Sequence, residues 1–88
     1  MLIVGQMARA IIRFSIDNES SNVTGNQIRD LLQDKGFDKI GTASFDTDGM
    51  DTASIVAVLR ELLPILETPP GGGRLDHLWI YVDQPEPN

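Results

Sequence analysis

The stretch Ala10-Ile-Ile-Arg-Phe-Ser-Ile-Asp17 alternates apolar and polar side chains along an extended backbone. Ile12, Phe14 and Ile16 fall on one side, because successive side chains of a strand point to opposite faces. The polar residues of the stretch fall on the other side. We therefore expect a half-buried strand that presents one face to a core.

The chain after this strand switches twice between helical and extended periodicity. Two amphipathic runs have helical spacing, and the second is apolar over about half its circumference. A short mixed run separates them, and a β-rich run follows the second. The expected elements are a strand over 10–17, a helix over 24–35, a strand run over 40–45, a helix over 52–67 and a strand over 75–82.

This order predicts an α+β ferredoxin-like two-layer sandwich, β-α-β(-β)-α-β, with both helices on one face of the sheet. The second and third strands must then fit into residues 38–49. Either Gly41-Thr42 turns a very short hairpin, or one strand is missing or supplied by a partner. The first and last strands are expected to be neighbours.

The residues around the two helices predict where each one begins and ends. Asn22 or Thr24 is expected to cap the first helix, and Gly36 to end it in a left-handed conformation. Asp51 or Thr52 is expected to cap the second.

Two prolines and a glycine run mark the second helix and the loop after it. Pro64 falls on the outer face of the helix, so we expect the helix to bend there and continue. We interpret Pro69–Gly73 as a mobile tether, because no helix follows the glycines to make a phosphate site.

Length and charge bound the class of protein. The 88 residues predict one domain over 8–83, with a loose extension over 1–7 and a tail over 84–88; Met7 is a second candidate start. The net charge of −6 argues against nucleic acid and anionic membranes as partners. The absence of cysteine excludes disulfides and thiolate sites. No apolar run is long enough to span a membrane, and we expect a cytoplasmic protein.

Asp17 is the candidate metal ligand, since a carboxylate at a strand end suits Mg²⁺. One carboxylate per chain is not a site, but two could meet across a dimer axis. A turn residue that accepts backbone N–H groups is the simpler interpretation. The run Asp46–Asp51 departs from the calcium-loop template, and we expect a turn at Asp48-Gly49 instead.

The last strand carries His77, Trp79 and Tyr81 on one side. If the opposite side lies under the helices, these three lie on an open sheet face beside Arg13 and Ser15. Aromatic residues on such a face can stack on RNA bases or hold a small ligand. A partner surface agrees better with the acidity, so we interpret Arg13, His77, Trp79 and Tyr81 as a dimer or partner surface.

The layout of residues 10–82 resembles small dimeric ferredoxin-like proteins of the CRISPR-associated adaptation subunit and virulence-associated protein D type. In that group a strand ends in Asp, a helix ends in Gly plus an apolar residue, and the next strand carries a Ser near an aromatic residue. Asp17, Ser44 and Phe45 match these positions. The resemblance implies metal-dependent ribonuclease, nucleic-acid-handling or antitoxin roles.

Two functions follow as hypotheses. The first is a non-enzymatic interaction or regulatory module, antitoxin-like or phage-related, that forms a homodimer, binds a protein partner and needs no cofactor. The apolar surplus of the second helix and the last strand favours the homodimer. The alternative is a Mg²⁺-dependent endoribonuclease with paired Asp17 carboxylates as the metal site and Ser44 as a further catalytic candidate.

Overall fold

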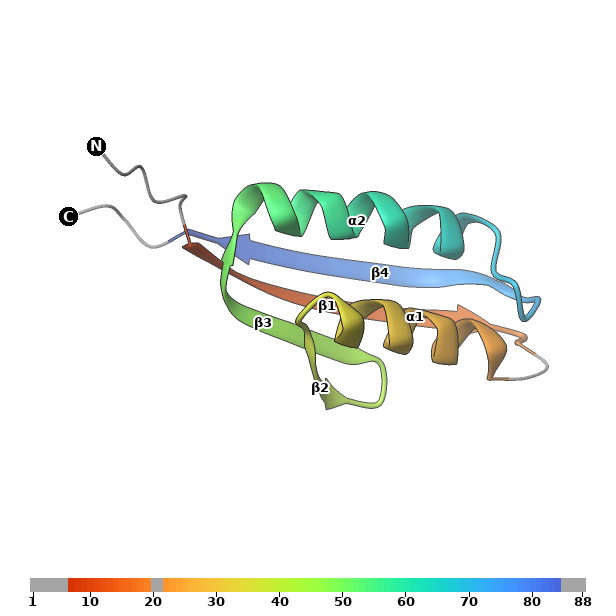
Figure 1. The fold of residues 1–88 in the computed structure, drawn as a ribbon. Coiled ribbons are helices and arrows are strands. Elements are labelled where there is room, and N and C mark those ends of the chain that lie inside the picture. The colour runs from red at the N-terminus through yellow and green to blue at the C-terminus, as the bar shows by residue number, and fades with distance from the viewer. Residues whose placement is uncertain (1–6, 20–21, 85–88) are drawn as a thin grey trace, which may run out of the picture.

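The computed structural model describes residues 7–19 and 22–84, which form one antiparallel sheet with two helices against it (Figure 1). The extension and tail expected at the chain ends lie largely outside these residues, and β1 begins at Met7. The elements are β1 (Met7–Asp17), α1 (Val23–Asp34), β2 (Asp38–Gly41), β3 (Ser44–Asp51), α2 (Thr52–Glu67) and β4 (Arg74–Asp83).

The strand order is β2-β3-β1-β4, and every neighbouring pair runs antiparallel. Both helices cover the same side of the sheet (Figure 1), so the predicted ferredoxin-like sandwich is confirmed. A short β2–β3 hairpin supplies the second and third strands from within the chain.

The predicted turn at Asp48-Gly49 is wrong, because β3 continues through both residues to Asp51. Ala8 pairs with Met50 and Arg9 with Asp48, so Gly49 is an extra residue in β3. Its φ of 89° is the left-handed conformation that glycine adopts without a Cβ clash. The segment is therefore a β-bulge inside the strand.

The core lies between the sheet and the helices. Alternate residues of β1 point into it, which confirms the predicted core face of that strand. Phe45 joins them from β3, and its ring lies parallel to that of Phe14 at a centroid distance of 6.4 Å. The buried apolar residues are Ala8, Ala10, Ile12, Phe14, Ile28, Leu32, Phe37, Phe45, Ile55, Val58, Leu62 and Leu66.

The end of α1 follows the sequence prediction. Gly36 has φ 97°, its N–H donates to Gln33, and the N–H of Phe37 donates to Leu32 at 2.8 Å. This pair of hydrogen bonds is a Schellman motif. Phe37 is buried, so the cap also anchors the following chain in the core.

The start of α1 differs from the prediction. Asn22 is the N-cap residue, but its side chain makes no cap hydrogen bond. Glu19 reaches forward instead, and its Oε1 accepts from the N–H of Thr24 at 2.8 Å. A carboxylate there also faces the positive end of the helix dipole.

The start of α2 is capped by Asp51, one of the two expected residues. Its carboxylate accepts from the N–H of Ser54 at 3.2 Å and from the Ser54 hydroxyl at 2.6 Å. These bonds favour the ionised form and lower the pKa of Asp51. The exposed Pro64 does not end α2, which continues to Glu67 as predicted.

The glycine loop is not a tether. The N–H of Gly71 donates to the buried Thr24 hydroxyl at 2.8 Å. Gly73 has φ 77°, and a Cβ placed on it would lie 2.3 Å from the carbonyl oxygen of Asp17. The loop is a shaped turn against the β1–α1 connection, because it needs both positive φ and a close backbone approach.

Candidate functional site: the open face of the sheet

One side of the sheet carries no helix, and we call it the open face (Figure 1). Odd-numbered residues of β1 point to it, because the even-numbered ones are in the core. Their partners in the neighbouring strands share that side. Apart from the two ends of β1, the three longer strands contribute Arg9, Ile11, Arg13, Ser15, Ser44, Asp46, Asp48, His77, Trp79, Tyr81 and Asp83 to the open face.

An aromatic and arginine cluster dominates the β4 side of this face. The rings of Trp79 and Tyr81 stack at a centroid distance of 6.0 Å with planes 10° apart. The guanidinium of Arg13 lies 5.5 Å from the Trp79 centroid, and that of Arg9 lies 5.9 Å from the Tyr81 centroid. Each contact contributes about 0.5–1 kcal/mol at an exposed site. The side chains are therefore held in place on the sheet.

Asp83 ties the far end of the cluster together. Its carboxylate accepts from Arg9 at 3.2 Å and from the Tyr81 hydroxyl at 2.9 Å. The negative charge of Asp83 raises the pKa of Arg9 above its ordinary value. Because the groups are exposed, the ion pair orders the side chains more than it stabilises the fold.

The rings remain open to solvent despite these contacts. Trp79 is 48% exposed and Tyr81 is 39% exposed. Tryptophan, tyrosine and arginine are the residue types that most often carry the free energy of protein–protein binding. The cluster is thus an ordered surface with the composition of an interface.

An acidic row lies on the other side of β1. Asp48 is opposite Arg9 and Asp46 is opposite Ile11 in the β1–β3 register. The open face therefore has three parallel stripes, aromatic on β4, basic and aliphatic on β1, and acidic on β3. A binding partner must therefore match both the charges and the aromatic side chains of these stripes, which favours one partner in one orientation.

The structure places the predicted surface residues together. Trp79 is opposite Arg13 and His77 is opposite Ser15, as β1–β4 pairing requires. His77 contacts its neighbour Asp76 through Nδ1 at 3.1 Å. Sequence reasoning missed Arg9, because the strand was expected to begin at Ala10.

The signal for that longer strand was present in the sequence. The run Met7-Ala8-Arg9 continues the alternation, with Ala8 as the core residue. An alanine is a weak apolar signal, although it suffices where the space between layers is narrow.

The two catalytic candidates are not brought together. Asp17 ends β1 opposite Arg74, whereas Ser44 begins β3 opposite Arg13. Arg13 and Asp17 are four residues apart, which is about 13 Å along a strand. Phe45 is a core residue. Among residues 7–19 and 22–84, no group of three or more His, Cys, Asp or Glu side chains could hold a metal ion.

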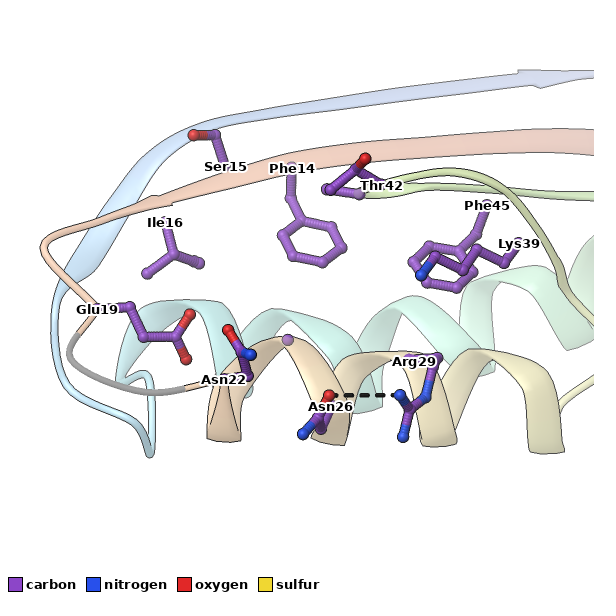
Figure 2. Close-up of a pocket in the computed structure, with 12 residues that line it drawn as sticks. Phe14, Ser15, Ile16, Glu19, Asn22, Asn26, Arg29, Lys39, Thr42 and Phe45 are labelled. Carbon is purple, nitrogen blue, oxygen red and sulfur yellow. Dashed lines mark hydrogen bonds between the residues drawn. The ribbon is translucent and has the colours of Figure 1, made fainter.

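A cavity of about 400 Å³ lies on the helix side, between α1 and the end of the sheet (Figure 2). Phe14, Ile16 and Phe45 form its apolar side, as Figure 2 shows. Arg29 lies on the α1 side, where it donates to Asn26 at 3.3 Å. Two of the polar side chains in the lining are also engaged outside it, since Arg29 pairs with Asp30 at 3.0 Å and Glu19 accepts from the N–H of Thr24.

Comparison with known proteins found no protein-family model and no curated sequence that matches the chain. Within the part of the chain that the structure describes, no helix has the length and apolar character needed to cross a membrane. Function therefore has to be argued from the open face itself.

Proposed function

We propose that this protein is a non-enzymatic interaction module that works as a homodimer and binds a protein partner through the open face. The observation that carries the proposal is the exposed Trp79–Tyr81 pair with Arg9 and Arg13 held against it. Aromatic side chains that are already ordered lose little conformational entropy on binding, so a smaller part of the interaction free energy is lost to ordering them.

The charges of the face favour a protein over nucleic acid. Asp46 and Asp48 line the β3 side, and Asp83 occupies the β4 end. These carboxylates, with the net charge of −6, would repel a phosphate backbone. A protein partner with apolar side chains over the aromatic stripe and basic side chains over the acidic row would be complementary.

The resemblance to the CRISPR-associated adaptation subunit and virulence-associated protein D type supports a regulatory role of this kind, antitoxin-like or phage-related. In such a role a partner's activity changes when the module covers it. A cytoplasmic location and the absence of a required cofactor belong to the same proposal.

The test compares the proteins retained by three immobilised baits: the native chain, Trp79→Ala and Val56→Ala. Val56 is an exposed apolar residue on α2, away from the sheet, so its substitution is the matched control. We expect a protein that binds the native chain and the Val56 variant but not the Trp79 variant, with the same ranking when the purified pair is titrated. Equal binding by all three baits would contradict the proposal.

The endoribonuclease alternative stays a prediction with its own test. It requires two Asp17 carboxylates within about 8 Å of each other across a dimer, given Mg–O distances of about 2 Å. RNA is incubated with Mg²⁺ and either the native chain or Asp17→Ala. Cleavage by the native chain that the variant lacks would replace the interaction proposal.

A further inference from the structure

We propose that the outer edge of β4 is the self-association seam, where a second copy adds its own β4 in antiparallel orientation across a twofold axis. The two four-stranded sheets would then form one continuous sheet, with both open faces on the same side. This inference rests on the homodimer of the proposed function and names the surface that makes it.

The two edges of the sheet differ in how well they are protected. The edge strand β2 has four residues, contains a lysine and is irregular in its pairing with β3. The edge strand β4 has ten residues, and in the described chain only β1 pairs with it. Its register with β1 is shifted at Asp76, and the stretch from His77 to Asp83 is regular. Short, irregular or lysine-bearing edges resist pairing with another chain, whereas long regular edges invite it. The seam is therefore assigned to β4.

The hydrogen-bond direction of β1 shows which β4 groups face outward. The N–H of Phe14 donates to Ala43 on the β3 side at 3.2 Å. Neighbouring residues of a strand alternate in direction, so Arg13 bonds toward β4 and its partner Trp79 bonds back toward β1. The N–H and C=O groups of Leu78, Ile80 and Val82 consequently point away from the sheet.

The sequence of β4 suits intermolecular pairing. Residues 75–82 (Leu-Asp-His-Leu-Trp-Ile-Tyr-Val) contain no proline, glycine or lysine and are rich in strand-forming residues. Arg74 begins the strand and Asp83 ends it. Antiparallel pairing brings the basic end of each strand toward the acidic end of the other, whereas parallel pairing would place like charges together.

The outward groups also fix which registers are possible. Leu78, Ile80 and Val82 must lie opposite even-numbered residues of the partner's β4, because the odd-numbered residues from His77 to Asp83 bond back toward β1. One such register places Leu78 opposite the partner's Ile80 and Trp79 opposite its own copy, and it overlaps residues 75–83. The aromatic stripe, which lies at the rim of one sheet, would then lie at the centre of the combined sheet. The exposed Leu75 and Val82 would also be covered.

The first test is the mass of the full chain by light scattering at high micromolar concentration, for the native chain, Val82→Pro and Val82→Thr. The outward N–H of Val82 makes proline compatible with the folded chain but not with the seam. We expect the native chain and the threonine variant at twice the 9.7 kDa of the monomer. The proline variant should dissociate at least about tenfold more readily, since two symmetry-related hydrogen bonds are lost.

The second test uses the absence of cysteine from the chain. Trp79→Cys should give a disulfide-linked dimer on mild oxidation, because directly opposed residues of a non-hydrogen-bonded pair have Cα atoms about 4.5 Å apart, within disulfide range. Lys39→Cys on β2 is the control and should remain monomeric. This arm decides the question if Val82→Pro does not fold.

The outcomes separate this inference from the proposed function. A monomeric native chain would overturn the seam, while the bait experiment still tests partner binding by the open face. A dimer that survives Val82→Pro and cross-links no faster at position 79 than at position 39 would place self-association elsewhere. Loss of partner binding by Trp79→Ala with the seam intact would support both.

Discussion

The alternate residues of β1 contribute to both faces of the sheet, but the two faces differ in their role. Along β1, the alternate residues from Ala8 to Phe14 are buried beneath the helices, while Arg9 and Arg13, which lie between them, contact aromatic rings on the solvent side. On the covered face, contacts exclude water and stabilise the fold through apolar burial. On the open face, contacts are polar or aromatic and exposed, so they shape a surface with little gain in stability. This difference makes it possible to change one face while leaving the other intact.

The largest expected effect comes from adjacent isoleucines that point to opposite faces. Ile12→Ala should lower the free energy of unfolding by about 2–5 kcal/mol, because it leaves a cavity in a fully buried site. Ile11→Ala, on the open face, should cost clearly less. Chemical denaturation of both variants measures the difference. Equal losses would show that the open face is covered in solution, contrary to the comparison.

The second effect concerns the glycine turn at the end of the two layers. Gly73→Ala should destabilise the protein by more than the roughly 1–2 kcal/mol of a left-handed conformation alone. Its Cβ would collide with the Asp17 carbonyl oxygen, which is backbone and cannot move aside. Gly72→Ala is the matched control, since Gly72 has φ 80° but a Cβ placed on it would meet no atom within 4 Å. Equal melting temperatures for the two variants would instead support the interpretation of Pro69–Gly73 as a mobile tether.

The third effect concerns Trp79 on the open face, where we expect a substitution to affect association more than stability. Trp79→Ala should lower the free energy of unfolding by about 1–2 kcal/mol, less than Ile12→Ala, because it removes one exposed cation–π contact and one stacked ring. The same substitution should weaken association with other chains. Unfolding and binding are measured on one preparation. A variant that unfolds easily but associates normally would reverse the roles of the two faces.

A smaller effect of opposite sign is expected in α1. Gly25 lies within the helix, and a Cβ there would meet no atom within 4 Å. Gly25→Ala should therefore raise the free energy of unfolding by about 0.5–1 kcal/mol, since alanine loses less backbone entropy in a helix. Association through the open face should be unchanged. A loss of stability would indicate that the helix packs more tightly there than the structure shows.

The smallest effect is the pH dependence of the α2 cap. The pKa of Asp51 is lower in the folded chain than its ordinary 3.8, so the unfolded chain takes up this proton first as the pH falls. The cap therefore contributes fully above about pH 4 and is lost as the pH falls through the folded pKa. Melting temperatures of the native chain and Asp51→Asn should differ at neutral pH and converge in acid. A constant gap across this range would exclude the ionised cap.

The covered face was largely predictable from the sequence, because burial enforces periodicity. The alternation along β1 and the helical spacing of residues 52–67 are each tied to one layer of the core. The Gly36 cap was predictable because few residues adopt a left-handed conformation easily. The periodicity of side chains and the helix caps are local in the sequence, and together they predict the helices, the strands and the side of each that is buried.

The ends and the loops were predicted less well, because their contacts join segments far apart in the chain. Gly71 bonds to Thr24 and Gly73 packs on Asp17, and no local pattern encodes either approach. The Asp48-Gly49 pair was interpreted as a turn because the positive φ that glycine adopts occurs both in turns and in β-bulges. On the open face, the aromatic stripe was visible in β4, but Arg9 and Asp83 joined it only through the strand register.

The single tryptophan offers the most direct test that the open face and its β4 seam meet other chains. Acrylamide quenching of Trp79 fluorescence is measured from nanomolar to high micromolar protein for the native chain and Val82→Pro. We predict that quenching falls as the native chain becomes more concentrated, because in the dimer one side of the half-exposed Trp79 ring lies against its own copy. Val82→Pro should show this protection only at markedly higher concentration. Quenching of the native chain that stays constant across the range, or that falls equally in both proteins, would contradict the β4 seam.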